Sequence, residues 1–183
     1  MQKMSLAILT LVILVCSSPT MPNAAQSGPM PKDGELAFPS EYQSFPVFLS
    51  GVQKPDAIRD LYINPIGAQN QPGQAFANGS ILVMAIYNAK KNAEGALEKG
   101  TDGKLVKADL AKIFVMQKGA EWGKGAPENV KNGDWVYAAF KANGERLNVD
   151  YTTCRGCHLP LGESKDFVHR YDEYFEKRMH GEH

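Results

Sequence analysis

Short apolar runs separated by turn residues dominate the middle of the chain. The run SILVMAIYNA at residues 80–89 is rich in β-branched residues and follows an Asn-Gly turn pair, which predicts a buried strand. The runs DLAKIFVMQKG (109–119) and DWVYAAFKANGERL (134–147) predict two further strands. The segment DAIRDLYINP (56–65) alternates less evenly, but it ends at a proline-containing turn and also predicts a strand.

Helical patterns lie towards the two ends of the chain. Residues 165–180 place four aromatic side chains at helical spacing with charges on the other face, which predicts an amphipathic helix. The segment EYQSFPVFLSG (41–51) predicts a short helix that is entered or interrupted at Pro46. The polar residues 89–108 predict a long excursion between two strands. The expected fold class is therefore mainly β (α+β), an antiparallel β-sheet core with flanking helices.

Residues 1–25 have the build of a secretory signal peptide. Lys3 supplies a short basic start, residues 6–15 form an apolar run, and small residues lead to a cleavage point near Ala24 or Ala25. The apolar run is too short to span a bilayer. We therefore expect an exported protein that resides in the periplasm or elsewhere outside the cytoplasm.

Length and charge indicate one domain without a nucleic-acid partner. Removal of the signal leaves about 158 residues, which suffice for one core but are short for two. We expect a leader and N-terminal segment at 26–50, loose where it is rich in Pro and Gly, and a folded domain at 51–183. With 20 basic and 20 acidic residues the net charge is zero, and no basic block suggests binding to nucleic acid.

The cysteine count changes on export. The chain has three cysteines, and Cys16 would leave with the signal. Lipidation at Cys16 is disfavoured because Val15 is bulkier than the residue that usually precedes a lipidation site. The mature chain then keeps Cys154 and Cys157, and one close pair is not the pattern of a small protein held together by disulfides.

The stretch Cys154-Arg155-Gly156-Cys157-His158 has the spacing of covalent c-type haem attachment. Each thiol can form a thioether with a haem vinyl group, and two intervening residues let one turn of backbone reach both vinyls. The adjacent imidazole of His158 can then bind the iron as an axial ligand. Gly156 keeps a side chain away from the macrocycle. The sequence therefore predicts one covalent haem c.

Three other readings of the pair are weaker. A thioredoxin-type redox couple should follow a strand within a βαβ unit, and no such unit is evident. A zinc site would need more ligands, but there is no second cysteine pair and the remaining histidines gather near the C-terminus. A structural disulfide would not explain the histidine directly after the second cysteine.

The function of a haem protein depends on the other axial position of the iron. Met84 and Met116 lie in strand-like runs, where core packing is the more common role of methionine. His169 is expected at the surface, and His180 and His183 in a solvated tail. We therefore expect an apolar, open face, which suits neutral diatomic ligands such as nitric oxide and carbon monoxide.

Four blocks of the chain together resemble the cytochrome P-460 family, which includes the cytochrome c-prime-beta-like proteins. They are IRDLYINP, FANGSILVMAIY, NGDWVYAAF, and CRGCH followed by KDFVHRYD, and the similarity runs from about residue 58 to residue 171. The resemblance implies a mostly antiparallel β fold around one haem, commonly a homodimer, with five-coordinate iron held by His158. Known members oxidise hydroxylamine or bind nitric oxide.

The chain departs from the hydroxylamine-oxidising members at two positions. The alignment puts Met84 where those members have a lysine bonded to the haem edge, and a thioether cannot form that bond. It puts Phe114 where they have a carboxylate, and a phenyl ring cannot accept a proton. Met84 and Phe114 are thus candidates for a distal pocket. Arg59 is a candidate contact for a haem propionate, with a surface salt bridge as the alternative.

These observations favour an exported monohaem c-type cytochrome with five-coordinate iron that binds small nitrogen oxides such as nitric oxide. Hydroxylamine oxidation, and electron transfer to a redox partner protein with Met84 or Met116 as sixth ligand, remain as alternatives. Whether the protein is an enzyme stays open. A four-helix haem bundle is disfavoured because the middle of the chain lacks four amphipathic helices.

Overall fold

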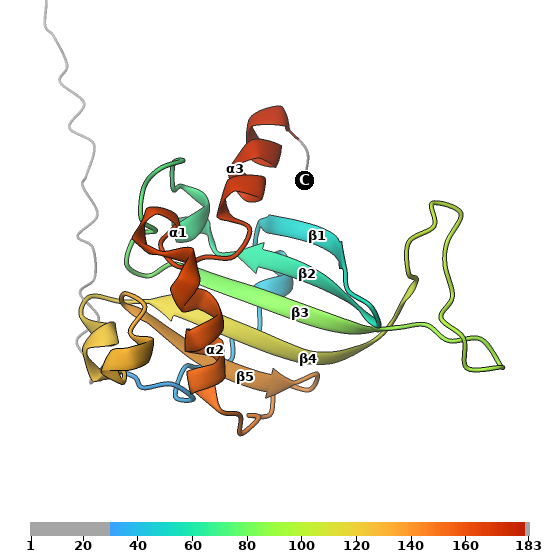
Figure 1. The fold of residues 1–183 in the computed structure, drawn as a ribbon, viewed down its shortest axis with the longest axis horizontal. Helices are drawn as coiled ribbons and strands as arrows, with labels where there is room; N and C mark the ends of the chain where they lie inside the picture. The colour runs from blue at the N-terminus through green and yellow to red at the C-terminus, as the bar shows by residue number, and fades with distance from the viewer. Residues whose placement is uncertain (1–29, 182–183) are drawn as a thin grey trace, which may run out of the picture.

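A five-stranded antiparallel sheet forms the centre of the protein (Figure 1). The computed structural model describes residues 30–181, so the expected signal peptide and Cys16 lie outside the described residues. The strands are paired in chain order, so that each is hydrogen-bonded to the next along the sequence. They are β1 (Val47–Gln53), β2 (Ala57–Ile63), β3 (Ile81–Ala89), β4 (Lys107–Lys118) and β5 (Trp135–Lys141). The predicted antiparallel β core is confirmed.

Strand β1 replaces the helix that the sequence predicted at 41–51. A 3-10 turn covers only Tyr42–Ser44, and the chain after Pro46 pairs with β2. The register shifts twice along this pair, so both Phe48 and Leu49 are buried although they are adjacent. Irregular pairing of this kind hides the two-residue period of a strand, which explains the wrong prediction.

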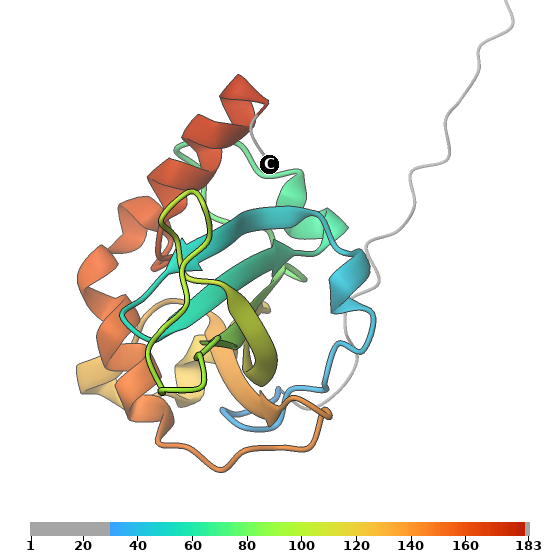
Figure 2. The same ribbon diagram turned by 90° about the vertical axis from the view of Figure 1, so that its right-hand side faces the viewer.

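Two of the helices lie across one face of the sheet (Figure 2). The predicted C-terminal helix begins later than expected, at Tyr171, because three residues before it adopt left-handed backbone angles. No helix among residues 30–181 is long and apolar enough to cross a membrane. The helices are α1 (Pro65–Ala68), α2 (Tyr151–His158) and α3 (Tyr171–His180), with short 3-10 turns η1 (Tyr42–Ser44), η2 (Trp122–Gly125), η3 (Glu128–Val130), η4 (Leu159–Leu161) and η5 (Glu163–Lys165).

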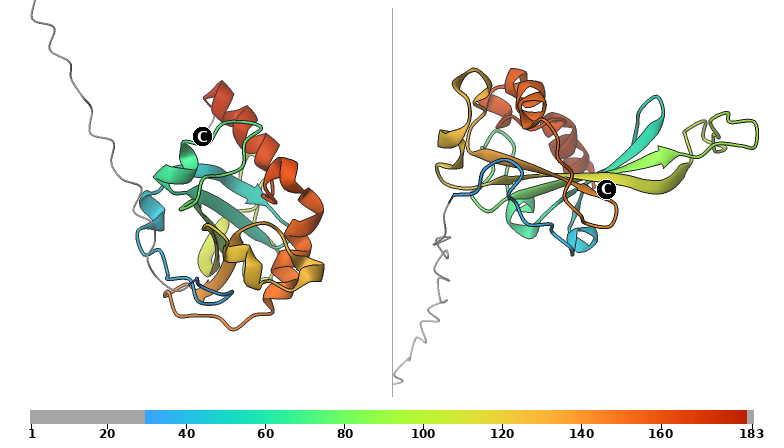
Figure 3. Two further views of the ribbon diagram at one scale, coloured as in Figure 1. Left: turned by 90° about the vertical axis from the view of Figure 1, so that its left-hand side faces the viewer. Right: turned by 90° about the horizontal axis from the view of Figure 1, so that it is seen from below.

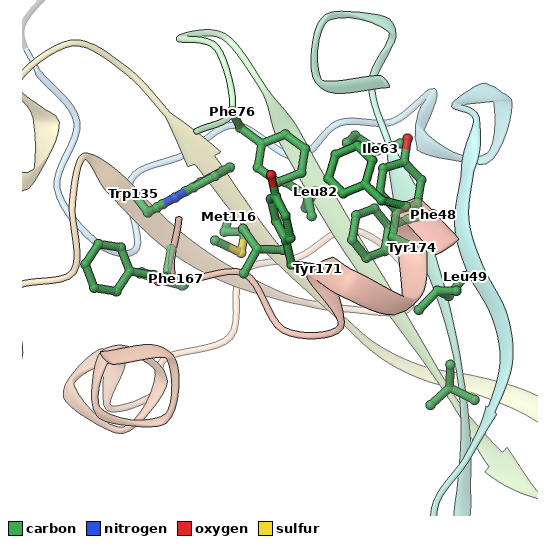
Figure 4. Close-up of a cluster of buried hydrophobic side chains, with 14 residues drawn as sticks. Phe48, Leu49, Ile63, Phe76, Leu82, Met116, Trp135, Phe167, Tyr171 and Tyr174 are labelled. Atoms are coloured by element: carbon green, nitrogen blue, oxygen red, sulfur yellow. The ribbon is translucent and has the colours of Figure 1, made fainter. Parts of the chain in front are cut away.

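The sheet buries apolar side chains on both faces. The face that packs against α2 and α3, here called the helical face, carries Ile63, Leu82, Met116, Trp135 and Tyr137. Aromatic residues of α3 complete this cluster, and Phe48 stacks on Tyr174 with ring centroids 4.1 Å apart (Figure 4). The opposite face carries Val83, Ala85, Ile113, Val115, Val136, Ala138 and Phe140.

The N-terminal segment covers this opposite face (Figure 3). Leu36 and Tyr42 are each only 3% exposed, and the ring of Phe38 lies 5.1 Å from that of Phe140. The expectation of a loose leader is therefore wrong for the part that the structure describes. Although this segment is rich in Pro and Gly, it forms turns that lie along the sheet and is not a free chain.

The predicted excursion between β3 and β4 projects from the end of the sheet (Figures 1 and 3). Two isolated antiparallel bridges, Lys91 with Leu97 and Lys99 with Leu105, hold it together. Most of its residues are exposed.

Candidate functional site

The Cys-Arg-Gly-Cys-His stretch forms the second half of α2. Asp150 caps the helix by accepting a hydrogen bond from the backbone N–H of Thr152. Positions 154, 157 and 158 are three and four residues apart, so their side chains share one side of the helix. Cys154 is half-buried, Cys157 is exposed, and both thiols are free. One helical segment thus presents two thiols and an imidazole together.

Arg155 fixes α2 to the sheet. Its side chain is 2% exposed, and its guanidinium donates two hydrogen bonds to the carboxylate of Asp33 at 2.6 and 3.0 Å. It also donates to Asn132 Oδ1 at 2.7 Å and to the carbonyl of Trp135 at 3.0 Å. Its guanidinium carbon lies 5.3 Å from the ring centroid of Tyr137. Arg155, the first of the two residues between the cysteines, therefore has a structural role that the sequence did not indicate.

His158 is held as a neutral ligand. Its Nδ1 lies 2.7 Å from the carbonyl oxygen of Phe167, and because a carbonyl can only accept, Nδ1 carries the proton. Burial lowers the pKa of His158 to about 4, so the ring is neutral near pH 7. Nε2 therefore presents a lone pair, which is the form of imidazole that binds a metal ion.

A second histidine lies beside this ligand. The ring of His169 packs edge-to-face on that of His158, with centroids 4.7 Å apart. Its Nε2 lies 3.4 Å from Sγ of Cys157. Partial desolvation of its ring by neighbouring groups is the main cause that lowers the pKa of His169. The sequence placed His169 at the surface, which its exposure confirms, but gave no sign that it adjoins the motif.

The sheet next to α2 carries an apolar strip on its helical face. Leu61, Met84, Phe114 and Ala139 are direct partners across β2 to β5, and alternation puts them on the same face as Met116 and Tyr137. Leu61, Met84 and Phe114 are only half-buried. The structure thus brings the two predicted pocket residues side by side. Met116 lies instead in the core cluster with α3 and is 7% exposed.

Arg59 precedes this strip on β2 and also lies on the helical face. Its Nε is buried without a hydrogen-bond partner, and it forms no ion pair with any residue in 30–181. Burial lowers the pKa of Arg59, and the nearby charge of Arg170 lowers it further. The described residues thus show no surface salt bridge at Arg59. A buried donor without an acceptor needs an explanation, and a carboxylate of a bound group would provide one.

The residues present fit a haem. Helix α2 carries two free thiols and one neutral imidazole with a free nitrogen, and the face of the sheet that it covers carries an unpaired guanidinium and an apolar strip. A Cβ at Gly156 would meet no atom within 4 Å outside its own helix. Nowhere in residues 30–181 do three His, Cys, Asp or Glu side chains cluster to hold a metal ion. The described residues therefore form no zinc site from side chains alone. An iron atom in a haem would not need such a cluster, because the porphyrin supplies most of its ligands.

Comparison with known proteins agrees with this fit. A family model described as Cytochrome P460 matches residues 39–170, which include all five strands, α2 and the predicted site residues Arg59, Met84, Phe114, Cys154, Cys157 and His158. No curated protein matches the chain. The match confirms the resemblance read from the four sequence blocks. It also extends it to the N-terminal side, into the segment that packs against the sheet. The chain belongs to the cytochrome P460 family and is a c-type haem protein.

Proposed function

We propose that the protein binds nitric oxide and similar neutral diatomic ligands at a single haem c. Cys154 and Cys157 would hold the haem through thioether bonds, and Nε2 of His158 would bind its iron. When bound, the haem would supply a ferrous iron able to take up such ligands. The observation that carries the proposal is the apolar strip Leu61–Met84–Phe114, which lies on the face of the sheet that α2 covers.

The chemistry of the strip favours binding over turnover. None of its members can donate a hydrogen bond to bound dioxygen, protonate a peroxide or remove a proton from hydroxylamine. Lys112 lies beside the strip, with its Nζ 5.6 Å from the ring centroid of Phe114. An ammonium is not a proton acceptor at neutral pH. Hydroxylamine oxidation is therefore the second candidate, not the first.

Electron transfer would need a sixth protein ligand. Met116 is enclosed in the core cluster with Trp135 and Phe167, which argues against its release to bind iron. Met84 is half-buried on the strip, so its thioether is the one candidate within the strip for this role. A low-spin ferrous haem that does not bind carbon monoxide would support Met84 ligation and contradict our proposal.

Three further features complete the proposal. Arg59 forms an ion pair with a haem propionate, which the unpaired Nε supports. The protein is exported and acts in the periplasm or elsewhere outside the cytoplasm, since its first residues match a secretory signal. It forms a homodimer, as its family resemblance suggests, and it exchanges electrons with a redox partner protein.

The test uses Phe114→Ala and a matched control, Phe38→Ala, on the opposite face of the sheet. Truncation of Phe114 opens the strip, so nitric oxide and carbon monoxide should bind the ferrous protein faster in stopped-flow measurements. Phe38→Ala should leave the rates at the wild-type value. Equal rates in Phe114→Ala and wild type would remove Phe114 from the pocket. Sustained hydroxylamine oxidation with an artificial acceptor would favour the second candidate.

A further inference from the structure

The loop between η5 and α3 has an unusual backbone directly behind His158. Asp166 and Phe167 both have positive φ angles, 46° and 57°. Positive φ angles are unfavourable for residues other than glycine. The carbonyl that this backbone presents is the one that accepts the hydrogen bond from His158 Nδ1. Strain at this place calls for a compensating set of contacts.

Asp166 supplies these contacts, and it is only 5% exposed. Its two carboxylate oxygens accept hydrogen bonds from Nζ of Lys118 at 2.7 and 2.8 Å, and Oδ2 also accepts from the backbone N–H of Phe76 at 2.8 Å. Its own carbonyl accepts from the indole Nε1 of Trp135 at 2.9 Å. The end of β4, the start of β5 and the loop before β3 therefore all hold one residue.

The partners of Asp166 are themselves buried. Lys118 is 9% exposed and Trp135 is fully buried, and the ammonium of Lys118 lies 5.7 Å from the centroid of the indole ring. Trp135 lies in the same core cluster as Phe167 (Figure 4). Movement of the Asp166–Phe167 backbone would break these bonds together. The carbonyl of Phe167 is thus fixed in place by the core of the protein.

We propose that Asp166, held by Lys118 and Trp135, is a positioning residue that sets the tautomer, orientation and basicity of the axial ligand His158. The inference rests on the proposed function, because it assigns His158 to the iron. A hydrogen bond at Nδ1 orients a metal-binding imidazole and raises its basicity. A more basic ligand strengthens the bond to iron and favours the ferric state. Loss of the Asp166 contacts should therefore weaken the bond and raise the reduction potential.

The test compares Asp166→Asn with Asp60→Asn in the haem-loaded protein. Asp60 is a matched control, since it is 6% exposed and is bound by a lysine, Lys107, and by a backbone N–H, that of Gly51, elsewhere on the sheet. In resonance Raman spectra of the ferrous protein, Asp166→Asn should shift the iron–histidine band to lower frequency. In a redox titration its potential should be more positive. Asp60→Asn should leave both at the wild-type value.

Further variants separate positioning from stability. Lys118→Met should reproduce both shifts, and Lys118→Arg, which keeps a cation opposite the carboxylate, should restore most of the wild-type values. Trp135→Phe keeps an aromatic ring but loses the indole donor to the Asp166 carbonyl. It replaces Asp166→Asn in the same two measurements if Asp166→Asn does not fold. Lower stability with an unchanged band and potential would overturn the inference alone. A wild-type protein without an iron–histidine band would overturn the inference together with the proposed function.

Discussion

Replacement of Arg155 by methionine tests how the haem-binding helix is attached to the sheet. Methionine keeps much of the apolar length of the side chain, so the change removes the charge and the donors with little loss of volume. The partners left behind are Asp33, the side-chain oxygen of Asn132 and the carbonyl of Trp135. Asn132 and Trp135 are fully buried, so water cannot replace the lost donors there.

The size of the effect follows from these contacts. Removal of one partner from a buried ion pair costs about 3–5 kcal/mol. The side chain of Asp33 is 20% exposed, so water partly solvates its carboxylate once the guanidinium is gone. We therefore expect Arg155→Met to lower the free energy of unfolding by about 3 kcal/mol, the lower end of that range. Arg155→Lys keeps the charge but not the planar fork, so its loss should be smaller.

The assay is urea unfolding of the haem-loaded protein, followed by far-ultraviolet circular dichroism. Lys141→Met is the control, because Lys141 forms an exposed ion pair with Glu145 in which the side chains are 55% and 61% exposed. Such a pair contributes less than about 1 kcal/mol. Arg155 and Asp33 variants should also be non-additive, with a coupling of about 0.5–3 kcal/mol. A loss in Arg155→Met no larger than that in Lys141→Met would refute the reasoning.

Two further predictions concern charge. Arg59→Met should lower the reduction potential, because a positive charge near the iron favours the ferrous state. The control Lys99→Met, on the exposed excursion, should leave the potential unchanged. An unchanged potential in Arg59→Met would place Arg59 away from the haem. Burial raises the pKa of Tyr62 to about 12 from its ordinary value of 10.0, so the unfolded chain loses this proton first as the pH rises. The free energy of unfolding should therefore fall between those two pH values, and urea titrations should show a smaller fall in Tyr62→Phe; equal slopes would contradict the assignment.

The sequence predicted the strands whose pattern is local. The runs at 80–89 and 109–119 are rich in β-branched residues and bounded by turns, and they correspond to β3 and β4. Strand β1 was missed because Pro46 and Gly51 interrupt the pattern and two register shifts obscure it. The order of the strands and the packing of the N-terminal segment depend on contacts between distant residues, which leave no local pattern.

The functional site also has a part that the sequence predicted and a part that it did not. The spacing of Cys154, Cys157 and His158 alone indicated haem attachment, because the covalent chemistry constrains neighbouring residues. The Asp33–Arg155 pair joins residues 122 positions apart, and no local pattern announces such a contact. The indole of Trp135 donates a hydrogen bond to the backbone carbonyl of Asp166, behind His158, and the strand pattern around Trp135 does not indicate this contact. Side-chain contacts of this kind become visible only in three dimensions.

The most direct test of the central claim is the absorption spectrum of the purified ferrous protein before and after addition of carbon monoxide. The protein should be expressed in a host that can attach haem to c-type cytochromes. We expect a red protein with a high-spin, five-coordinate spectrum that changes completely when carbon monoxide binds. A colourless protein, or sharp low-spin bands that carbon monoxide does not alter, would contradict the claim.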